Sequence, residues 1–170
     1  DYIMTCSGFT YDSFLKHGVP EKKVLKVPYG VNLGFFLDKK NIIKQKSTTF
    51  RVICVGLMCL RKGIPYLLQD WKKLGLPENK TELLLVGNVK NDLKQYLKRV
   101  SIQKNVIFYG SVNREKLLEL YKRASLFVLP SIEEGLSMTI AESMSCGLPV
   151  VCTTNTGGEE LIENGTHGFI

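Results

Sequence analysis

The sequence lacks the segments that mark several protein classes. In its 170 residues no apolar stretch approaches the roughly 20 residues that a helix needs to span a bilayer. The chain opens at Asp1 without a basic segment followed by an apolar run, so the sequence predicts no signal peptide. Its two histidines, His17 and His167, have no cysteine or carboxylate at ligand spacing, which argues against a zinc site. Together these absences predict a cytoplasmic protein.

Cysteine pairs are also lacking. The five cysteines include no CxxC motif, and their odd number does not suit a disulfide framework. Cys54 and Cys152 lie within apolar runs, which is typical of small side chains in a core. We therefore expect free thiols in a reducing compartment.

The composition is that of an ordinary globular domain, with 44% hydrophobic and 23% charged residues. The net charge is +7, and residues 1–50 carry eight of the lysines against four acids. Such a balance suits phosphorylated ligands or anionic lipid, and solvated surface lysines explain it equally well. Nothing in the pattern specifically indicates a nucleic-acid partner.

From residue 51 onward, short apolar runs alternate with stretches of helical periodicity. The predicted strands are 51–55, 82–86, 105–109, 125–129, 149–152 and 168–170, and the predicted helices are 64–74, 92–101, 114–123, 138–145 and 159–163. Apolar runs without polar alternation suit strands that are buried on both faces. The fold class is therefore α/β, a Rossmann-like doubly wound parallel sheet.

The first 50 residues do not follow this repeat. Residues 10–17 read as a short helix that Gly18 stops, and residues 23–27 read as a strand. Residues 39–49 form a polar, lysine-rich segment. We expect residues 1–30 to end a preceding domain, residues 31–48 to be a linker and residues 49–170 to be the main domain.

Ligands of open α/β sheets bind in the loops at the carboxyl ends of the strands. The first of these loops, 56–63, matches neither G-x-G-x-x-G nor the P-loop pattern. It does place Arg61 and Lys62 just before a helix N-terminus, where cations and free N–H groups favour a phosphate. A Lys-Gly pair before a helix is common, so this signal is weak by itself.

A second loop, 130–137, leads into the helix predicted from Met138. Ser137 is placed to cap that helix, and Glu134 and Glu142 lie on either side of its start. Five helical steps from Ser137 to Glu142 cover roughly 7 Å, so the two carboxylates could flank a diphosphate over the helix N-terminus. On spacing alone, the simpler interpretation is that Glu134 is solvated and that Glu142 pairs with a lysine.

These motifs, taken in order, make a family recognisable. The two glutamates separated by seven residues and followed by Ser-Met-Ser-Cys-Gly-Leu-Pro-Val-Val resemble the signature of family 4 (group 1) retaining glycosyltransferases of the GT-B fold. Similar segments of that family match residues 27–32, 55–68, 127–131 and 157–168. The resemblance identifies residues 1–30 as the end of the N-terminal acceptor domain and residues 49–170 as a nucleotide-sugar-binding C-terminal domain, truncated at its C-terminus.

The resemblance implies roles for the matching residues. Glu142 would accept hydrogen bonds from the ribose hydroxyls, and Glu134 would contact hydroxyls of the donor sugar. Lys62, together with Arg61, would neutralise the diphosphate, and Glu134 and Lys62 would be the catalytic residues. The rest of the donor site would comprise Gly135, Leu136, Ser137, Met138 and Thr139 at the anion-binding helix start, and Gly87, Asn88, Val89, Gly110 and Ser111 around the base.

The reaction implied by the resemblance is hexosyl transfer from a nucleotide-sugar to a glycan or lipid-linked acceptor, as in polysaccharide biosynthesis. No metal or other cofactor is expected, since no Asp-x-Asp constellation occurs. A lipid-linked acceptor would bring the protein into peripheral contact with the inner face of the membrane. The acceptor would bind through the preceding domain, so residues 1–170 alone are expected to be inactive.

Three departures from the family pattern stand out. Leu57 replaces the arginine that follows the first strand's glycine, and Leu136-Ser137 replaces an aromatic-Gly pair. Neither His17 nor His167 matches the family's histidine near the reacting sugar. Two other interpretations therefore stay open: another GT-B nucleotide-sugar enzyme such as an epimerase, and a nucleotide-binding module without transfer activity.

Overall fold

The computed structural model describes residues 1–36 and 48–170. The described residues form two parallel sheets, a small one near the N-terminus and a six-stranded one in the rest of the chain. The large sheet has the strand order β5-β4-β3-β6-β7-β8, and every pair in it is parallel. Its strands are β3 (Phe50–Val55), β4 (Thr81–Val86), β5 (Val106–Gly110), β6 (Leu126–Leu129), β7 (Val150–Cys152) and β8 (Gly168–Phe169).

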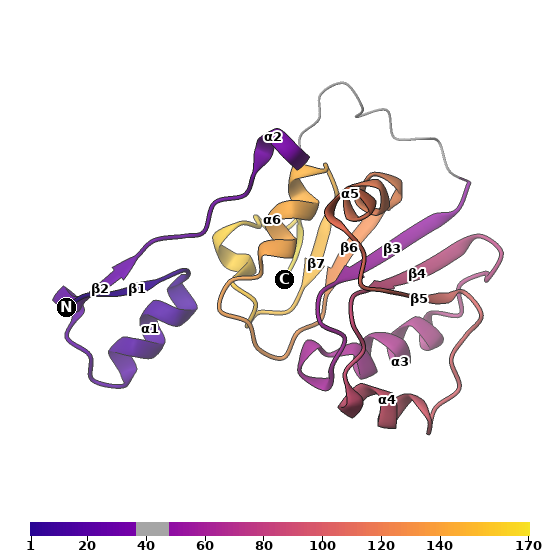
Figure 1. Ribbon diagram of the computed structural model, residues 1–170, viewed down its shortest axis with the longest axis horizontal. Helices are drawn as coiled ribbons and strands as arrows, with labels where there is room; N and C mark the ends of the chain where they lie inside the picture. The colour runs from indigo at the N-terminus through magenta and orange to yellow at the C-terminus, as the bar shows by residue number, and fades with distance from the viewer. Residues whose placement is uncertain (37–47) are drawn as a thin grey trace.

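From the neighbouring strands β3 and β6 the chain builds the sheet outward in opposite directions, as in doubly wound dinucleotide-binding sheets. This order confirms the predicted fold class. Helices cover both faces of the sheet: α3 and α4 lie on one side and α5 and α6 on the other (Figure 1). They are α3 (Ile64–Leu74), α4 (Asn91–Leu97), α5 (Arg114–Arg123) and α6 (Met138–Ser145).

The core is divided between the two faces of the sheet. Along β3, Val52 and Cys54 pack into the cluster beneath α3 and α4, whereas Ile53 and Val55 belong to the cluster beneath α5 and α6. Both sets are buried, which is why the strand reads as a continuous apolar run. Helix α3 buries Ile64, Leu68 and Trp71, whose spacing places them on one helical face.

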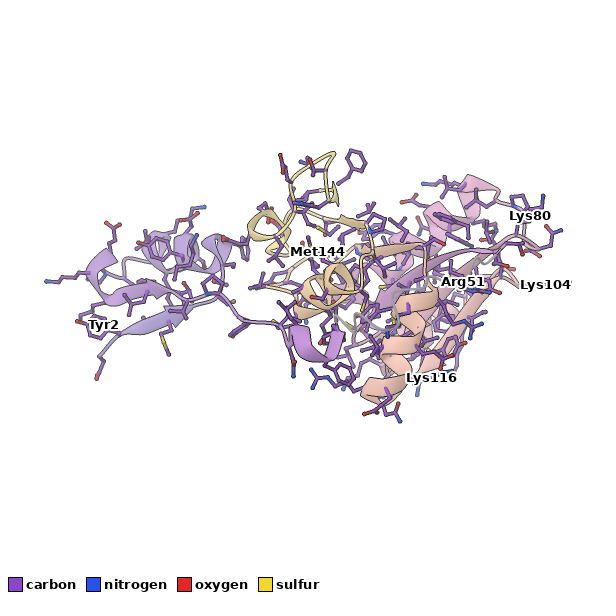
Figure 2. All side chains as sticks on the ribbon, turned by 90° about the horizontal axis from the view of Figure 1, so that it is seen from above. Tyr2, Arg51, Lys80, Lys104, Lys116 and Met144 are labelled. Atoms are coloured by element: carbon purple, nitrogen blue, oxygen red, sulfur yellow. The ribbon has the colours of Figure 1, made fainter. Side chains whose placement is uncertain are left out.

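The N-terminal unit, residues 3–26, is a second small α/β arrangement. Strands β1 (Ile3–Thr5) and β2 (Val24–Lys26) pair in parallel, connected through α1 (Gly8–Lys16) and the 3₁₀ turn η1 (Glu21–Lys23). A capping box between Ser7 and Thr10 starts α1. Figure 2 shows this unit, next to Tyr2, set apart from the larger one, with Lys80 and Lys104 at the far end of the molecule.

Several boundaries differ from those predicted. The predicted helix 159–163 is a 3₁₀ turn, η3 (Gly158–Glu160), because Leu161 leaves the helical region at φ −122. The predicted helix 92–101 ends at Leu97, and β1 and α2 (Leu33–Phe36) were not predicted. Three helices, 64–74, 114–123 and 138–145, have the predicted bounds.

Parts of the predicted organisation remain open. Most of the lysine-rich segment 39–49 lies outside the described residues, and the domain division at 30 and 48 stays a prediction. All five cysteines are free. Among the described residues, no helix combines the length and the apolar character needed to cross a membrane.

Candidate functional site

The predicted site residues lie at the carboxyl edge of the large sheet, which faces the N-terminal unit in Figure 1. Two loops meet there, the one after β3 and the one after β6. Gly63 adopts φ 67, and a Cβ at this position would lie 1.8 Å from the carbonyl oxygen of Pro130. Only glycine allows this approach, so Gly63 brings the two loops into contact. The amide of Ile132 also donates to the carbonyl of Arg61 at 2.9 Å.

This contact places both cations of the first loop beside one carboxylate of the second. Lys62 and Arg61 belong to the turn η2 (Leu60–Lys62). The ammonium of Lys62 forms an ion pair with Oε1 of Glu134, and Arg61 Nη1 lies 3.1 Å from the same oxygen. Arg61 also donates to the carbonyl of Glu133 at 2.6 Å. The side chain of Lys62 is 12% exposed and that of Arg61 is 52% exposed, so Lys62 is the cation withdrawn from water.

The start of α6 follows directly after Glu134. Leu136 and Ser137 are buried, so what they present to a ligand is backbone rather than side chain. Ser137 is the N-cap residue of α6, as predicted, but the predicted capping hydrogen bond is absent. Its hydroxyl instead bonds to the hydroxyl of Thr139 at 2.9 Å. The amide of Ile140 donates to the carbonyl of Ser137 at 3.1 Å, but the remaining first-turn amides of α6 still favour an anion.

Glu142 lies in the second turn of α6, half-buried. The hydroxyl of Tyr121 in α5 donates to its Oε2 at 3.3 Å. Burial raises the pKa of Glu142, while the Tyr121 hydrogen bond and the charge of Arg114 act in the opposite direction. The lysine partner that the simpler interpretation suggested is therefore replaced by a tyrosine.

A hollow of about 270 Å³ opens where β3, β4 and β5 end. Its lining is mostly apolar side chains and glycine backbone, and it includes Leu57, whose exposed fraction is 39%. The lining residues are Val55, Gly56, Leu57, Val86, Gly87, Asn88, Ser111, Val112 and Leu117. A flat apolar ring fits such a wall better than a phosphate does.

Other predicted residues lie at the border of this hollow or outside it. Gly110 adopts φ 69 and accepts a bond from the Gly87 amide at 2.8 Å, which holds the ends of β4 and β5 together. Val89 forms an isolated bridge with Met58 and lines a separate, more polar hollow with Lys90. Asn88 lines both hollows.

The N-terminal unit touches the second loop directly. The hydroxyl of Ser7 donates to the carbonyl of Gly135 at 2.5 Å. The amide of Gly8 donates to Glu160 at 2.6 Å, and Lys26 pairs with the same carboxylate at 3.4 Å. The start of α1 therefore contacts the loop before α6 at Gly135.

Sequence reasoning missed three residues of this region. Asp92 accepts a bond from the Leu60 amide at 3.0 Å, and that bond lowers the pKa of its carboxyl. Tyr121 and Arg114 both act on Glu142 from α5. No motif marks any of the three, because each contact joins residues more than twenty positions apart. In the described part of the chain, no group of three or more His, Cys, Asp or Glu side chains could hold a metal ion.

Comparison with known families gives one match, to the family described as Glycosyl transferases group 1, over residues 49–170. An uncharacterised glycosyltransferase of Methanocaldococcus jannaschii is 29% identical, over 99% of this chain and 48% of its own length. Mannosylfructose-phosphate synthase of Agrobacterium fabrum is 32% identical, over 99% of this chain and 41% of its own length. The chain thus spans less than half the length of these curated relatives.

Among solved structures, that of Anabaena Alr3699/HepE in complex with UDP and glucose has a TM-score of 0.81 at 22% identity. The match covers 99% of this chain and 48% of the Anabaena chain. At this level of identity it shows a shared fold, the Rossmann-like α/β unit of GT-B enzymes.

Proposed function

The chain belongs to the group 1 glycosyltransferases, and on that premise we propose that it is the donor-binding part of a metal-independent, retaining enzyme. In the proposed reaction a hexosyl group moves from a nucleotide-sugar to a glycan or lipid-linked acceptor. The observation that carries the proposal is the meeting of Lys62 and Arg61 with Glu134 at the start of α6. It joins two cations, a carboxylate and a helix N-terminus at one edge of a doubly wound sheet.

The diphosphate would be recognised by the two cations. When the bond between sugar and phosphate breaks, negative charge grows on the leaving diphosphate. Lys62, largely withdrawn from water, and the first-turn amides of α6 are fixed before that charge develops, so they would stabilise the transition state more than the ground state. Arg61 is more exposed, and solvent screens its contribution.

Glu134 would have two partners in turn. In the structure its carboxylate forms ion pairs with both cations. The sugar of a bound donor would lie beside this carboxylate. Sugar hydroxyls are good donors to a carboxylate. Donor binding would therefore transfer the cations from Glu134 to phosphate oxygens and leave the carboxylate for the sugar.

The nucleoside would occupy the sheet edge farther along. Glu142 offers carboxylate oxygens to a vicinal diol such as that of ribose, and the apolar hollow with Leu57 offers a wall for the base. The Anabaena structure holds UDP, which makes UDP the first nucleotide to test here. The acceptor, the proposed cytoplasmic location and contact with the inner face of the membrane concern the whole protein and stay proposals.

The proposal is tested by calorimetry of the 170-residue chain with UDP, GDP and ADP, each in EDTA and again with Mg²⁺. We expect one of them to bind equally well in both conditions and to raise the melting temperature. Phosphate alone should bind far more weakly, since it lacks the ribose and base contacts. Binding that requires Mg²⁺ would contradict the metal-independent assignment, and binding of none of the three would contradict the donor site itself.

A further inference from the structure

The hydroxyl of Tyr121 is the group that most directly constrains Glu142. Tyr121 is fully buried, and the bond from its hydroxyl to Glu142 Oε2 measures 3.3 Å. A phenol hydroxyl has one proton to donate, so engaging it at one carboxylate oxygen leaves the other oxygen free for a ligand.

Aromatic neighbours hold the Tyr121 ring on two sides. The ring of Phe36 meets it edge-on with centroids 6.3 Å apart, and that of Phe127 lies 6.2 Å away. Phe36 is itself buried, and its carbonyl accepts a bond from the Cys146 thiol at 3.8 Å. These contacts on two sides hold the phenol with its hydroxyl directed at Glu142 of α6.

The hydroxyl also keeps its proton. Burial and the neighbouring charge of Glu142 raise the pKa of Tyr121 well above its usual range. Tyr121 is thus a donor at every pH at which the protein would be assayed. A donor of this kind stabilises the charged carboxylate, against the burial that raises the pKa of Glu142.

From this geometry we infer that Tyr121 is a positioning residue for nucleotide recognition: held by Phe36, it fixes the Glu142 carboxylate so that its free oxygen accepts the ribose hydroxyls. The inference rests on the proposed function, because it needs Glu142 to face ribose. It adds a residue on a different helix, and it connects ribose recognition to α2 through one aromatic contact.

Few other groups act on this carboxylate. Arg114 favours its charged form from the start of α5, where its guanidinium stacks 4.4 Å from the ring centre of Phe35. Directly after α6, Cys146 is a neutral thiol at neutral pH because burial raises its pKa to about 11. Phe36, the residue of α2 that packs against Tyr121, does not titrate. A pH effect on Tyr121→Phe can therefore be assigned to Glu142.

The experiment measures the affinities of UDP and 2′-deoxy-UDP for the 170-residue chain between pH 5 and pH 8. We expect Tyr121→Phe to weaken UDP binding about threefold at pH 8 and to leave 2′-deoxy-UDP binding nearly unchanged, so that part of the roughly tenfold preference for UDP persists. Losing the donor raises the pKa of Glu142, so the preference for UDP should disappear at a higher pH in the variant than in the wild type. The control Tyr11→Phe removes the same kind of bond, from a tyrosine to Glu21 at 3.2 Å in the N-terminal unit, and should change neither affinity.

The outcomes separate this inference from the proposed function. One outcome would overturn the inference alone. The wild type prefers UDP and Glu142→Gln abolishes that preference, but folded Tyr121→Phe keeps both the preference and its pH midpoint. Wild type without a ribose preference would overturn both. If Tyr121→Phe does not fold, Phe36→Leu decides: it keeps the hydroxyl but loosens the ring, so a reduced preference supports the inference and an unchanged one overturns it.

Discussion

Lys62→Ala is the substitution that most directly probes the diphosphate site. Lys62 is 12% exposed and its ion pair with Glu134 is largely shielded from water, whereas Arg61 is 52% exposed. A charged hydrogen bond in such a setting contributes about 1.5–3 kcal/mol, which corresponds to a loss of about 10- to 150-fold in nucleotide affinity. The variant also leaves Glu134 with only its exposed cation, so the remaining carboxylate would repel the incoming diphosphate.

Arg61→Ala serves as the comparison within the site. Solvent screens its charge, so we expect a loss of about 0.2–1 kcal/mol, or at most roughly fivefold in affinity. Lys73→Ala is the matched control outside it, since Lys73 is 74% exposed and pairs with Asp70 one turn away. That variant should bind as the wild type does.

The assay is calorimetry of UDP binding at several salt concentrations, with circular dichroism to establish that each variant is folded. Wild-type affinity should fall as salt rises, because the recognition is between charges, and the fall should be shallower for Lys62→Ala. A folded Lys62→Ala protein that binds UDP with unchanged affinity would refute the reasoning and assign the phosphate to Arg61 or to the backbone of α6.

Two further predictions concern ribose and catalysis. Glu142→Ala should reduce the preference for a ribonucleotide over its 2′-deoxy form, expected at about tenfold or more in the wild type, while diphosphate binding persists; calorimetry on folded protein measures the ratio, and an unmoved ratio contradicts the assignment. The 170-residue chain should bind nucleotide but transfer no sugar, because one wall of the cleft would come from the rest of the preceding domain; radiolabelled transfer to a defined acceptor would disprove this.

The large sheet was predictable because its strands are buried on both faces. Runs such as Leu83–Val86 are apolar without alternation, and each is bounded by glycine or polar residues. Helices α3, α5 and α6 have strong local signals at both ends, such as Gly63 and Gly75 around α3. Short elements have weaker signals: η3 begins at the second of two glycines, Gly158, and ends after one turn.

The site was predictable only where residues near in sequence act together. The order of motifs placed Lys62 and Glu134 in loops at the same edge of the sheet. Their contact depends on Gly63, because only a residue without a side chain leaves room there for the Pro130 carbonyl. No periodicity encodes the bond from Tyr121 to Glu142, which joins two helices that are separate in the sequence. The roles assigned to these residues remain predictions.

Leu57, the departure from the family pattern that raised the question of activity, has a consistent place in the structure. It lines the apolar hollow together with Val112 and Leu117, and it takes no part in the ion pairs of Glu134 with Arg61 and Lys62. The cations come instead from η2, whose position is fixed by Asp92 at the Leu60 amide and by Gly63 against Pro130. A turn held at both ends positions Lys62 without a second cation at the strand end. We therefore expect Leu57 to extend the apolar wall for the base. The charge at the diphosphate would come from η2, so nucleotide binding would not require an arginine at position 57.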